Sequence, residues 1–118
     1  MDFKLTEEQL MIQQAAREFA QQQCLPGVIE RDENQIVPKE QLKQLVDLGL
    51  LGMLTNPTYG GAGMDTVSYV LAMEEISKVD SSVSVAMSVN NSLVCWGLEH
   101  FGSEAQKQKY LTPLAQGL

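Results

Sequence analysis

Few side chains in this sequence have the types and spacing that chemistry at one site requires. His100 is the only histidine, and no serine or cysteine has a spacing that proposes a base for a nucleophile. A hydrolytic triad is therefore disfavoured, and we expect His100 at the surface or at a helix end. Glu74 and Glu75 are adjacent, and neighbouring helical positions point about 100° apart, so both cannot act on one substrate. We expect them to form a solvated or ion-paired strip, and we predict no catalytic residue in this chain.

Two other features could suggest a metal or cofactor site. Cys24 and Cys95 lie far apart and match no C-x-x-C or Cys/His pattern, so we expect two buried thiols in a reducing compartment. The turn Tyr59–Gly63, Y-G-G-A-G, is rich in glycine like a phosphate cradle. It lacks the Lys and Ser/Thr of a P-loop and follows no strand, so a structural turn is the better interpretation. No metal site is predicted.

Composition and charge limit the classes of protein to consider. The 118 residues suit one domain, and 44% apolar with 19% charged residues is ordinary for a folded protein. The formal net charge of −7 argues against nucleic acid or an anionic membrane surface as a partner, because such binding depends on clustered Lys and Arg. No run approaches the ~20 apolar residues of a membrane span, and the start, MDFKLTEEQ, shows no targeting signal. We expect one cytoplasmic domain over 1–118.

Signals for helix starts and stops define the first half of the chain. Thr6–Gln9 is a capping box, and apolar residues then recur at helical spacing, which predicts a helix to about Cys24. Pro26 and Pro38 can each serve as the first residue of a further short helix. Gly49 is the expected C-terminal cap of the second of these helices.

The middle of the chain is more ambiguous. Residues 50–64 are rich in Gly and Pro at positions that only a loop tolerates. Asp65 can cap a helix over 66–78, which is apolar around most of its circumference and should be largely buried. Val83–Val89 alternates with the period of a strand. We favour a helix, because Asp80–Ser82 is a good source of an N-cap and a single short strand would leave its backbone groups unpaired.

The end of the chain completes the predicted fold class. Ser103–Gln106 is a second capping box, which predicts a basic helix from Lys107 to Leu111 that Pro113 ends. The predicted fold is all-α, an orthogonal or up-down bundle of about five to six helices. Three methionines on helical faces are core candidates, although flexible Met also lines apolar ligand cavities: Met64, Met73 and Met87.

Four separated motifs together resemble one enzyme family. They are the Y-G-G-x-G turn, M-E-E-I-S at Met73–Ser77, M-S-V-N-N-S-L at Met87–Leu93, and F-G-S-E-A-Q-K-Q-K-Y-L at Phe101–Leu111. In order and spacing they resemble the N-terminal domain of the acyl-CoA dehydrogenases, nearest to the short-chain (butyryl-CoA) branch. The resemblance covers essentially the whole chain and is far more specific than any one motif.

The resemblance implies that this chain is the N-terminal third of an enzyme. In the family a helical domain precedes a β domain and a second helical domain. FAD lies mainly between the last two, and a glutamate of the last removes the α proton. The reaction implied is dehydrogenation of an acyl-CoA to a trans-2-enoyl-CoA, with electron transfer flavoprotein as acceptor and a homo-tetramer as the assembly. This chain by itself would then be catalytically silent.

The resemblance also implies which residues bind substrate. In the family the acyl chain lies against the helix that matches Val83–Leu98, and the cavity positions correspond to Val85, Ala86, Val89, Asn90 and, one turn further, Leu93. Burial of one methylene is worth about 0.8 kcal/mol, so sharp chain-length selection needs a steric limit. We expect Val89 and Asn90 to shape the closed end of a short-chain cavity; for any one of these residues plain core packing is the alternative. The acidic domain would repel coenzyme A phosphates, so the nucleotide end is expected against another part of the protein.

Two other interpretations stay open. A non-catalytic helical interaction module, which binds a partner through an apolar groove, fits the lack of catalytic groups. An acyl-CoA oxidase or nitroalkane oxidase would share this domain and differ in how the reduced flavin is reoxidised. Downstream sequence separates the first from an enzyme: a β domain with a flavin-binding pattern supports the enzyme, and a stop codon at Leu118 supports the module.

Overall fold

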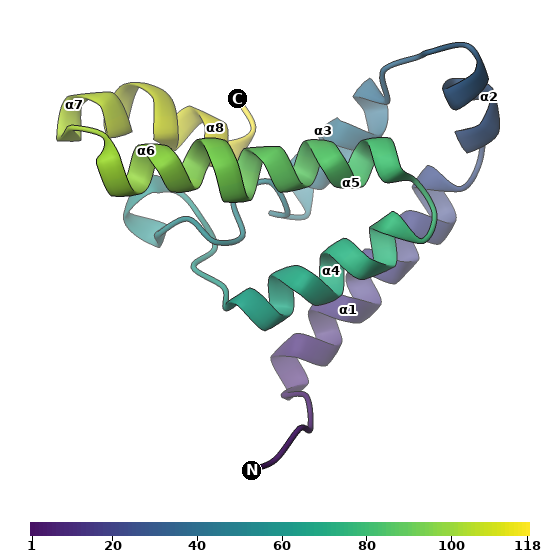
Figure 1. Cartoon of the computed structure of the whole chain (residues 1–118), viewed down its shortest axis with the longest axis horizontal. Coiled ribbons are helices and arrows are strands. Elements are labelled where there is room, and N and C mark those ends of the chain that lie inside the picture. The colour runs from purple at the N-terminus through teal and green to yellow at the C-terminus, as the bar shows by residue number, and fades with distance from the viewer.

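The computed structural model describes all of residues 1–118 as helices and connecting turns (Figure 1). Six continuous helices follow one another, three of them interrupted by a wide π-helical turn. They are α1 (Glu7–Phe19) with the wide turn Ala20–Cys24; α2 (Val28–Glu33); α3 (Lys39–Asp47); α4 (Thr66–Ser77); α5 (Ser81–Ser88), the wide turn Val89–Cys95 and α6 (Trp96–Phe101); and α7 (Glu104–Gln106), the wide turn Lys107–Leu111 and α8 (Thr112–Gln116). A 3₁₀ turn, Pro57–Tyr59, lies in the long loop. The predicted all-α fold is confirmed.

The helix starts follow from their capping side chains. Each of four caps accepts a hydrogen bond from a backbone N–H three residues further on: Thr6, Asp65, Asp80 and Ser103. Thr6 and Ser103 complete the two predicted capping boxes. The Asp80 carboxylate accepts from the Val83 N–H at 3.1 Å, which satisfies a donor that the first turn of α5 cannot pair. The segment 83–89 is therefore helical, as predicted, despite its strand-like period.

Three of the four prolines do not act as predicted. Pro26 lies before Gly27, whose φ of 75° turns the chain so that α2 begins only at Val28. Pro38 is the N-cap of α3 and not its first residue. Pro113 does not end a helix at Leu111, because α8 continues to Gln116. In the wide turn just before it, the Thr112 N–H bonds five residues back, to Lys107 O. The i→i−4 pattern is already interrupted there, which accommodates a residue that has no N–H to donate.

The helices form a thin slab with principal extents of 42 × 42 × 19 Å. The parallel pair α1 and α4 lies side by side, with Gln9 bonded to Asp65 near the two helix starts and Arg17 bonded to Glu75 near the two ends, and α5 with α6 makes a long rod set at an angle to this pair (Figure 1). The core runs between these elements and includes Leu45, Ile76 and Met87, with Met64 and Met73 packed at its edge. Such a thin domain leaves most of its helical surface outside the core.

The expectation that the helix over 66–78 is largely buried is wrong. Only four residues of α4 are buried, namely Ser68, Ala72, Glu75 and Ile76. Val67 and Val70 are about half exposed, at 48% and 53%. Contacts with α1 and α5 cover only part of α4, so Val67 and Val70 face outward.

Candidate functional site

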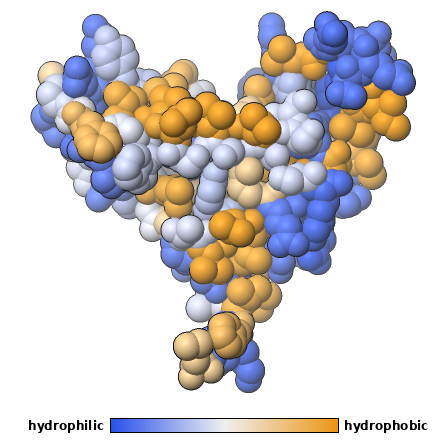
Figure 2. Space-filling model, viewed as in Figure 1, coloured by the Kyte–Doolittle hydropathy of each residue, from blue (hydrophilic) through white to orange (hydrophobic).

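The helix formed by α5, the wide turn and α6 has two apolar faces. Its inner row, spaced by four residues, is buried and consists of Val83, Met87, Asn91 and Cys95. Its outer row has the same spacing and is exposed to 58%, 42% and 68% at Val85, Val89 and Leu93. Figure 2 shows a hydrophobic band along this helix. Two apolar faces on opposite sides of one helix explain why the sequence alternates with period two without forming a strand. We call Val85, Val89 and Leu93 the outer row.

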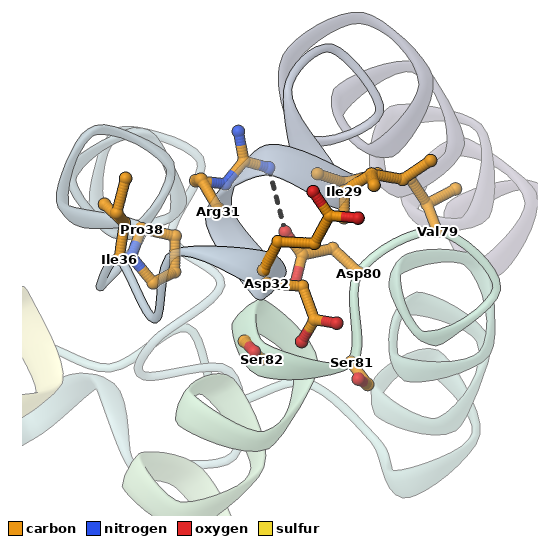
Figure 3. A pocket seen from close by; sticks show the side chains of 11 residues that line it. Ile29, Arg31, Asp32, Ile36, Pro38, Val79, Asp80, Ser81 and Ser82 are labelled. Atoms are coloured by element: carbon orange, nitrogen blue, oxygen red, sulfur yellow. Dashed lines mark hydrogen bonds and ion pairs between the residues drawn. The ribbon is translucent and has the colours of Figure 1, made fainter.

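A buried ion pair fixes the start of this helix. The Arg31 Nη2 atom of α2 lies 3.0 Å from Asp80 Oδ2, while Asp80 Oδ1 caps α5 (Figure 3). The Arg31 guanidinium also donates to Cys24 O at 2.6 Å and to Pro26 O at 2.9 Å. These contacts join the end of the first helix, α2 and the first turn of α5 into one corner.

A cavity of about 360 Å³ opens at this corner, between α2 and the turn from α4 to α5 (Figure 3). Its walls combine aliphatic side chains with Arg31, Asp32, Glu33 and Asp80. None of the five predicted substrate-binding residues lines it. The predicted site and the cavity are therefore different parts of the molecule.

Asn91 holds the wide turn Val89–Cys95 against the long loop. Its side chain is 1% exposed. Its carboxamide oxygen accepts from the Met53 N–H at 2.7 Å, and its nitrogen donates to Leu50 O at 2.8 Å and to Met87 O at 2.9 Å. The role of Asn91 is not predicted from its place in the sequence. The sequence signal for this role is the pair of carboxamides at Asn90 and Asn91 in a helix rich in apolar residues. A buried carboxamide needs hydrogen-bond partners for both its oxygen and its nitrogen, so such a pair indicates contacts with another segment.

The predicted residues Ala86 and Asn90 lie on a different side from the outer row. Both are partly buried, one turn apart along the helix. The Asn90 side-chain nitrogen donates to Leu51 O at 2.8 Å and to Leu114 O at 3.1 Å. The structure thus brings three of the five predicted residues into one exposed row, and it directs Asn90 toward the loop and α8.

The two adjacent glutamates have the separate environments that helical geometry predicts. Glu75 is buried and takes two hydrogen bonds from Arg17, at 3.0 and 3.1 Å, and one from Lys78 at 3.2 Å. The bonds from Arg17 are the main reason why the pKa of Glu75 is lowered. Glu74 is exposed and pairs with Lys78 at 3.3 Å. The expected ion-paired strip is confirmed.

The remaining reactive side chains also lack catalytic partners. His100 is exposed, stacks on Trp96 with ring centroids 4.2 Å apart, and places Nδ1 2.9 Å from Trp96 O. Cys24 and Cys95 are buried and free, and burial raises the pKa of Cys24 to about 12. Such a thiol is a poor nucleophile. No cluster of three or more His, Cys, Asp or Glu side chains could hold a metal ion. None of the helices combines the length and apolar character that crossing a bilayer requires.

The glycine turn is structural. The N–H groups of residues 60–64 all donate to carbonyl oxygens of this chain, so none is free to hold a phosphate. A Cβ at Gly61 would collide with the backbone of Thr55, so only glycine allows this close approach. These residues do not fit a flavin pyrophosphate, which typically takes free N–H groups at a glycine-rich turn.

These features define a thin helical domain with an uncovered apolar row along the helix of α5 and α6. A family model described as "Acyl-CoA dehydrogenase, N-terminal domain" matches residues 6–118. The chain therefore belongs to the acyl-CoA dehydrogenase family, as the four sequence motifs predict.

Named relatives and solved structures agree with this assignment. The short-chain specific acyl-CoA dehydrogenase of Clostridium acetobutylicum is 44% identical over 117 residues, which is 99% of this chain and 31% of that protein. Butyryl-CoA dehydrogenase from Megasphaera elsdenii has a TM-score of 0.92 at 40% identity, over 99% of this chain and 31% of that one. A structure described as the electron transferring flavoprotein of Acidaminococcus fermentans contains a chain with a TM-score of 0.93 at 44% identity, again over 99% and 31%. The chain thus spans about a third of the length of the relatives it matches.

Proposed function

We propose that this chain is the N-terminal helical domain of an FAD-dependent, short-chain acyl-CoA dehydrogenase, and that the outer row forms one wall of its acyl-chain cavity. The observation that carries the proposal is the outer row itself, three apolar side chains on a well-anchored helix with nothing of this chain over them. A relative and a structural neighbour named for short-chain and butyryl-CoA substrates support the substrate class.

The role of the row is to bind and orient the substrate. The reaction, α,β-dehydrogenation to a trans-2-enoyl-CoA, places charge on the thioester, and a dry apolar wall strengthens the electrostatic interactions around that group. A wall on a rigid helix also holds the chain in register, which lowers the entropic part of the barrier. The proton acceptor belongs to another part of a longer protein, because no residue of this chain has the surroundings of a catalytic base.

The proposed cofactor and partners are inferred from the family and not from residues of this chain. FAD would supply the hydride acceptor, and other domains would hold it, since the glycine turn here has no free N–H groups. Electron transfer flavoprotein is the proposed electron acceptor; the likeness to a chain in a structure described by that name supports it. The proposed assembly is a homo-tetramer, and it rests on the family resemblance alone.

An anaerobic titration of the full-length gene product with butyryl-CoA tests the proposal. Loss of the flavin absorbance band at one equivalent of butyryl-CoA is the expected result. A flavin band that persists with butyryl-CoA but bleaches with longer or branched thioesters would contradict the short-chain substrate and keep the enzyme class.

A helical interaction module is the second candidate, and the same outer row favours it. Uncovered apolar side chains on one helix face are also how docking surfaces are built. A full-length product that contains no flavin would favour this module over the dehydrogenase.

A further inference from the structure

We propose that Asn90 is a positioning residue for chain-length selection, because its carboxamide holds the wide turn Val89–Cys95 in the shape that keeps the outer row straight. The inference rests on the proposed function, since a straight row selects among substrates only if it faces the acyl chain. Asn90 would thus act through Val89 and Leu93 and would not itself touch the substrate.

The wide turn changes how the row is aligned. In a regular α-helix each step of four residues overshoots a full turn by about 40°, so a row of three residues drifts by about 80°. A turn closed by i→i+5 hydrogen bonds holds more residues per turn, so the step from Val89 to Leu93 drifts less. The outer row keeps all three side chains exposed, and the inner row stays buried from Val83 to Cys95. In a regular α-helix this drift would turn the residues at one end of each row away from the face that the residues at the other end occupy.

Side chains hold this turn open from two directions. Asn91 binds the loop from below the helix, where it is enclosed by the core. Asn90 bridges two carbonyls that belong to separate segments, Leu51 O in the long loop and Leu114 O in α8. A π-helical turn is rare and persists where its surroundings stabilise it. The two amides are those surroundings.

Asn90 differs from Asn91 in what its loss would do. Asn91 is 1% exposed and satisfies several backbone groups of the core, so its removal would damage the fold as a whole. Asn90 is only partly buried and directly follows Val89 of the outer row. Its loss would release the turn from α8 and from Leu51 O, and it would leave the contacts of Asn91 with Leu50 and Met53 in place.

The test uses Asn90→Asp in the full-length gene product. This change keeps the size of the side chain and replaces its donor group by an acceptor that faces two carbonyls. Asn90→Ala gives the same test if the first variant does not accumulate as folded protein. The matched control is Ser92→Ala, because the Ser92 hydroxyl lies in the same turn and donates only within the helix, to Ser88 O at 2.8 Å.

Two readouts are needed. The first is the ratio of kcat/KM for butyryl-CoA to that for octanoyl-CoA, which we expect to fall about tenfold in the Asn90 variants and to stay unchanged in Ser92→Ala. The second is hydrogen exchange of the backbone over 89–95 and 112–116, which we expect to speed up only in the Asn90 variants.

The outcomes separate the inference from the proposed function. An unchanged substrate ratio, or an equal change in Ser92→Ala, would overturn the positioning role even when the wild-type protein oxidises butyryl-CoA. Unchanged exchange over both segments would overturn the clamp itself, with or without enzyme activity. A wild-type protein that oxidises no acyl-CoA contradicts the proposed function, and the selection role is then lost with it.

Discussion

On the α1–α4 side of the slab a carboxylate is buried, whereas on the α5–α6 side apolar side chains are exposed. Glu75 is buried there with hydrogen bonds from Arg17 and Lys78. The outer row is 42% to 68% exposed. A buried charged side chain is tolerated only when it has hydrogen-bonding or ion-pair partners, and Arg17 and Lys78 are those partners for Glu75. The difference teaches that the first side satisfies within this domain the charge that it buries, while the second leaves an apolar row uncovered, as a docking or substrate-binding surface would be.

The largest effect should come from the corner that anchors the two sides to each other. Arg31→Met leaves Asp80, whose side chain is 5% exposed, without its cation. We expect the free energy of unfolding to fall by about 3–5 kcal/mol, because a buried charge is left unpaired. Urea unfolding of the chain followed by circular dichroism measures it.

A double-mutant cycle sharpens this prediction. Asp80→Asn keeps an oxygen that can cap α5 and removes the charge, so Arg31→Met combined with it should recover part of the loss. Additive losses in the double variant would show that the two side chains act independently, and the corner would not be an ion-paired anchor.

A smaller effect is expected from Glu75→Gln. The loss at pH 7 should be about 1.5 kcal/mol, at the lower end for charged hydrogen bonds, because Arg17 and Lys78 are half exposed. The folded pKa of Glu75 is lowered from 4.5, so its contribution is complete above about pH 4.5 and is lost as the pH falls through the folded value. Unfolding curves from pH 7 to pH 3 should therefore converge for the variant and the wild type. A difference that stays constant over this range would contradict the assignment.

Gly97→Ala should increase stability on the α5–α6 side. A Cβ at Gly97 meets no atom within 4 Å, and the residue lies inside a helix, so the change should add about 0.5–1 kcal/mol. Gly102→Ala is the control, because its Cβ would collide with the carbonyl oxygen of Leu98 and should destabilise the chain. Thermal melts of the two variants, read by circular dichroism, compare them directly. A loss of stability in Gly97→Ala would mean that this face of α6 is covered.

The smallest effect should come from the outer row. Leu93→Ser removes a side chain that is 68% exposed, and we expect a change within about 0.5 kcal/mol. Val83→Ala, in the buried row of the same helix, should cost clearly more. Midpoints of denaturant unfolding, measured for both variants, show which row contributes more to stability. Equal losses of stability in the two variants would mean that the outer row packs as part of the core, which is the alternative to a substrate-binding role for these residues.

Much of the fold follows from local sequence. The capping boxes at Thr6 and Ser103 and the cap at Asp80 depend on residues three positions apart, so they are visible in the sequence. The burial of Glu75 was not visible, because Arg17 lies 58 residues away along the chain. The continuation of the last helix past Pro113 depends on the wide turn before it, and no short pattern announces such a turn.

The candidate site, like the fold, can be predicted from the sequence only in part. The resemblance selected Val85, Val89 and Leu93, and their exposure on one face fits an apolar wall, although their contact with a substrate stays a prediction. The direction of Asn90 could not be predicted, because it is set by Leu51 and Leu114, which are 39 and 24 residues away. Local spacing fails to predict the direction of a side chain when its partners are distant in the sequence.

The three wide turns, Ala20–Cys24, Val89–Cys95 and Lys107–Leu111, have a consequence for how this family can vary. A π-helical turn arises when a helix accommodates one additional residue without a loop. Insertions and deletions of a single residue between relatives should therefore fall in these three segments of helix as well as in the loops. In a regular stretch of α-helix the loss of one residue would rotate the following residues by about 100°, whereas in a wide turn the loss of a single codon would restore a regular helix, and the following helix would present the same face while every connecting loop kept its length.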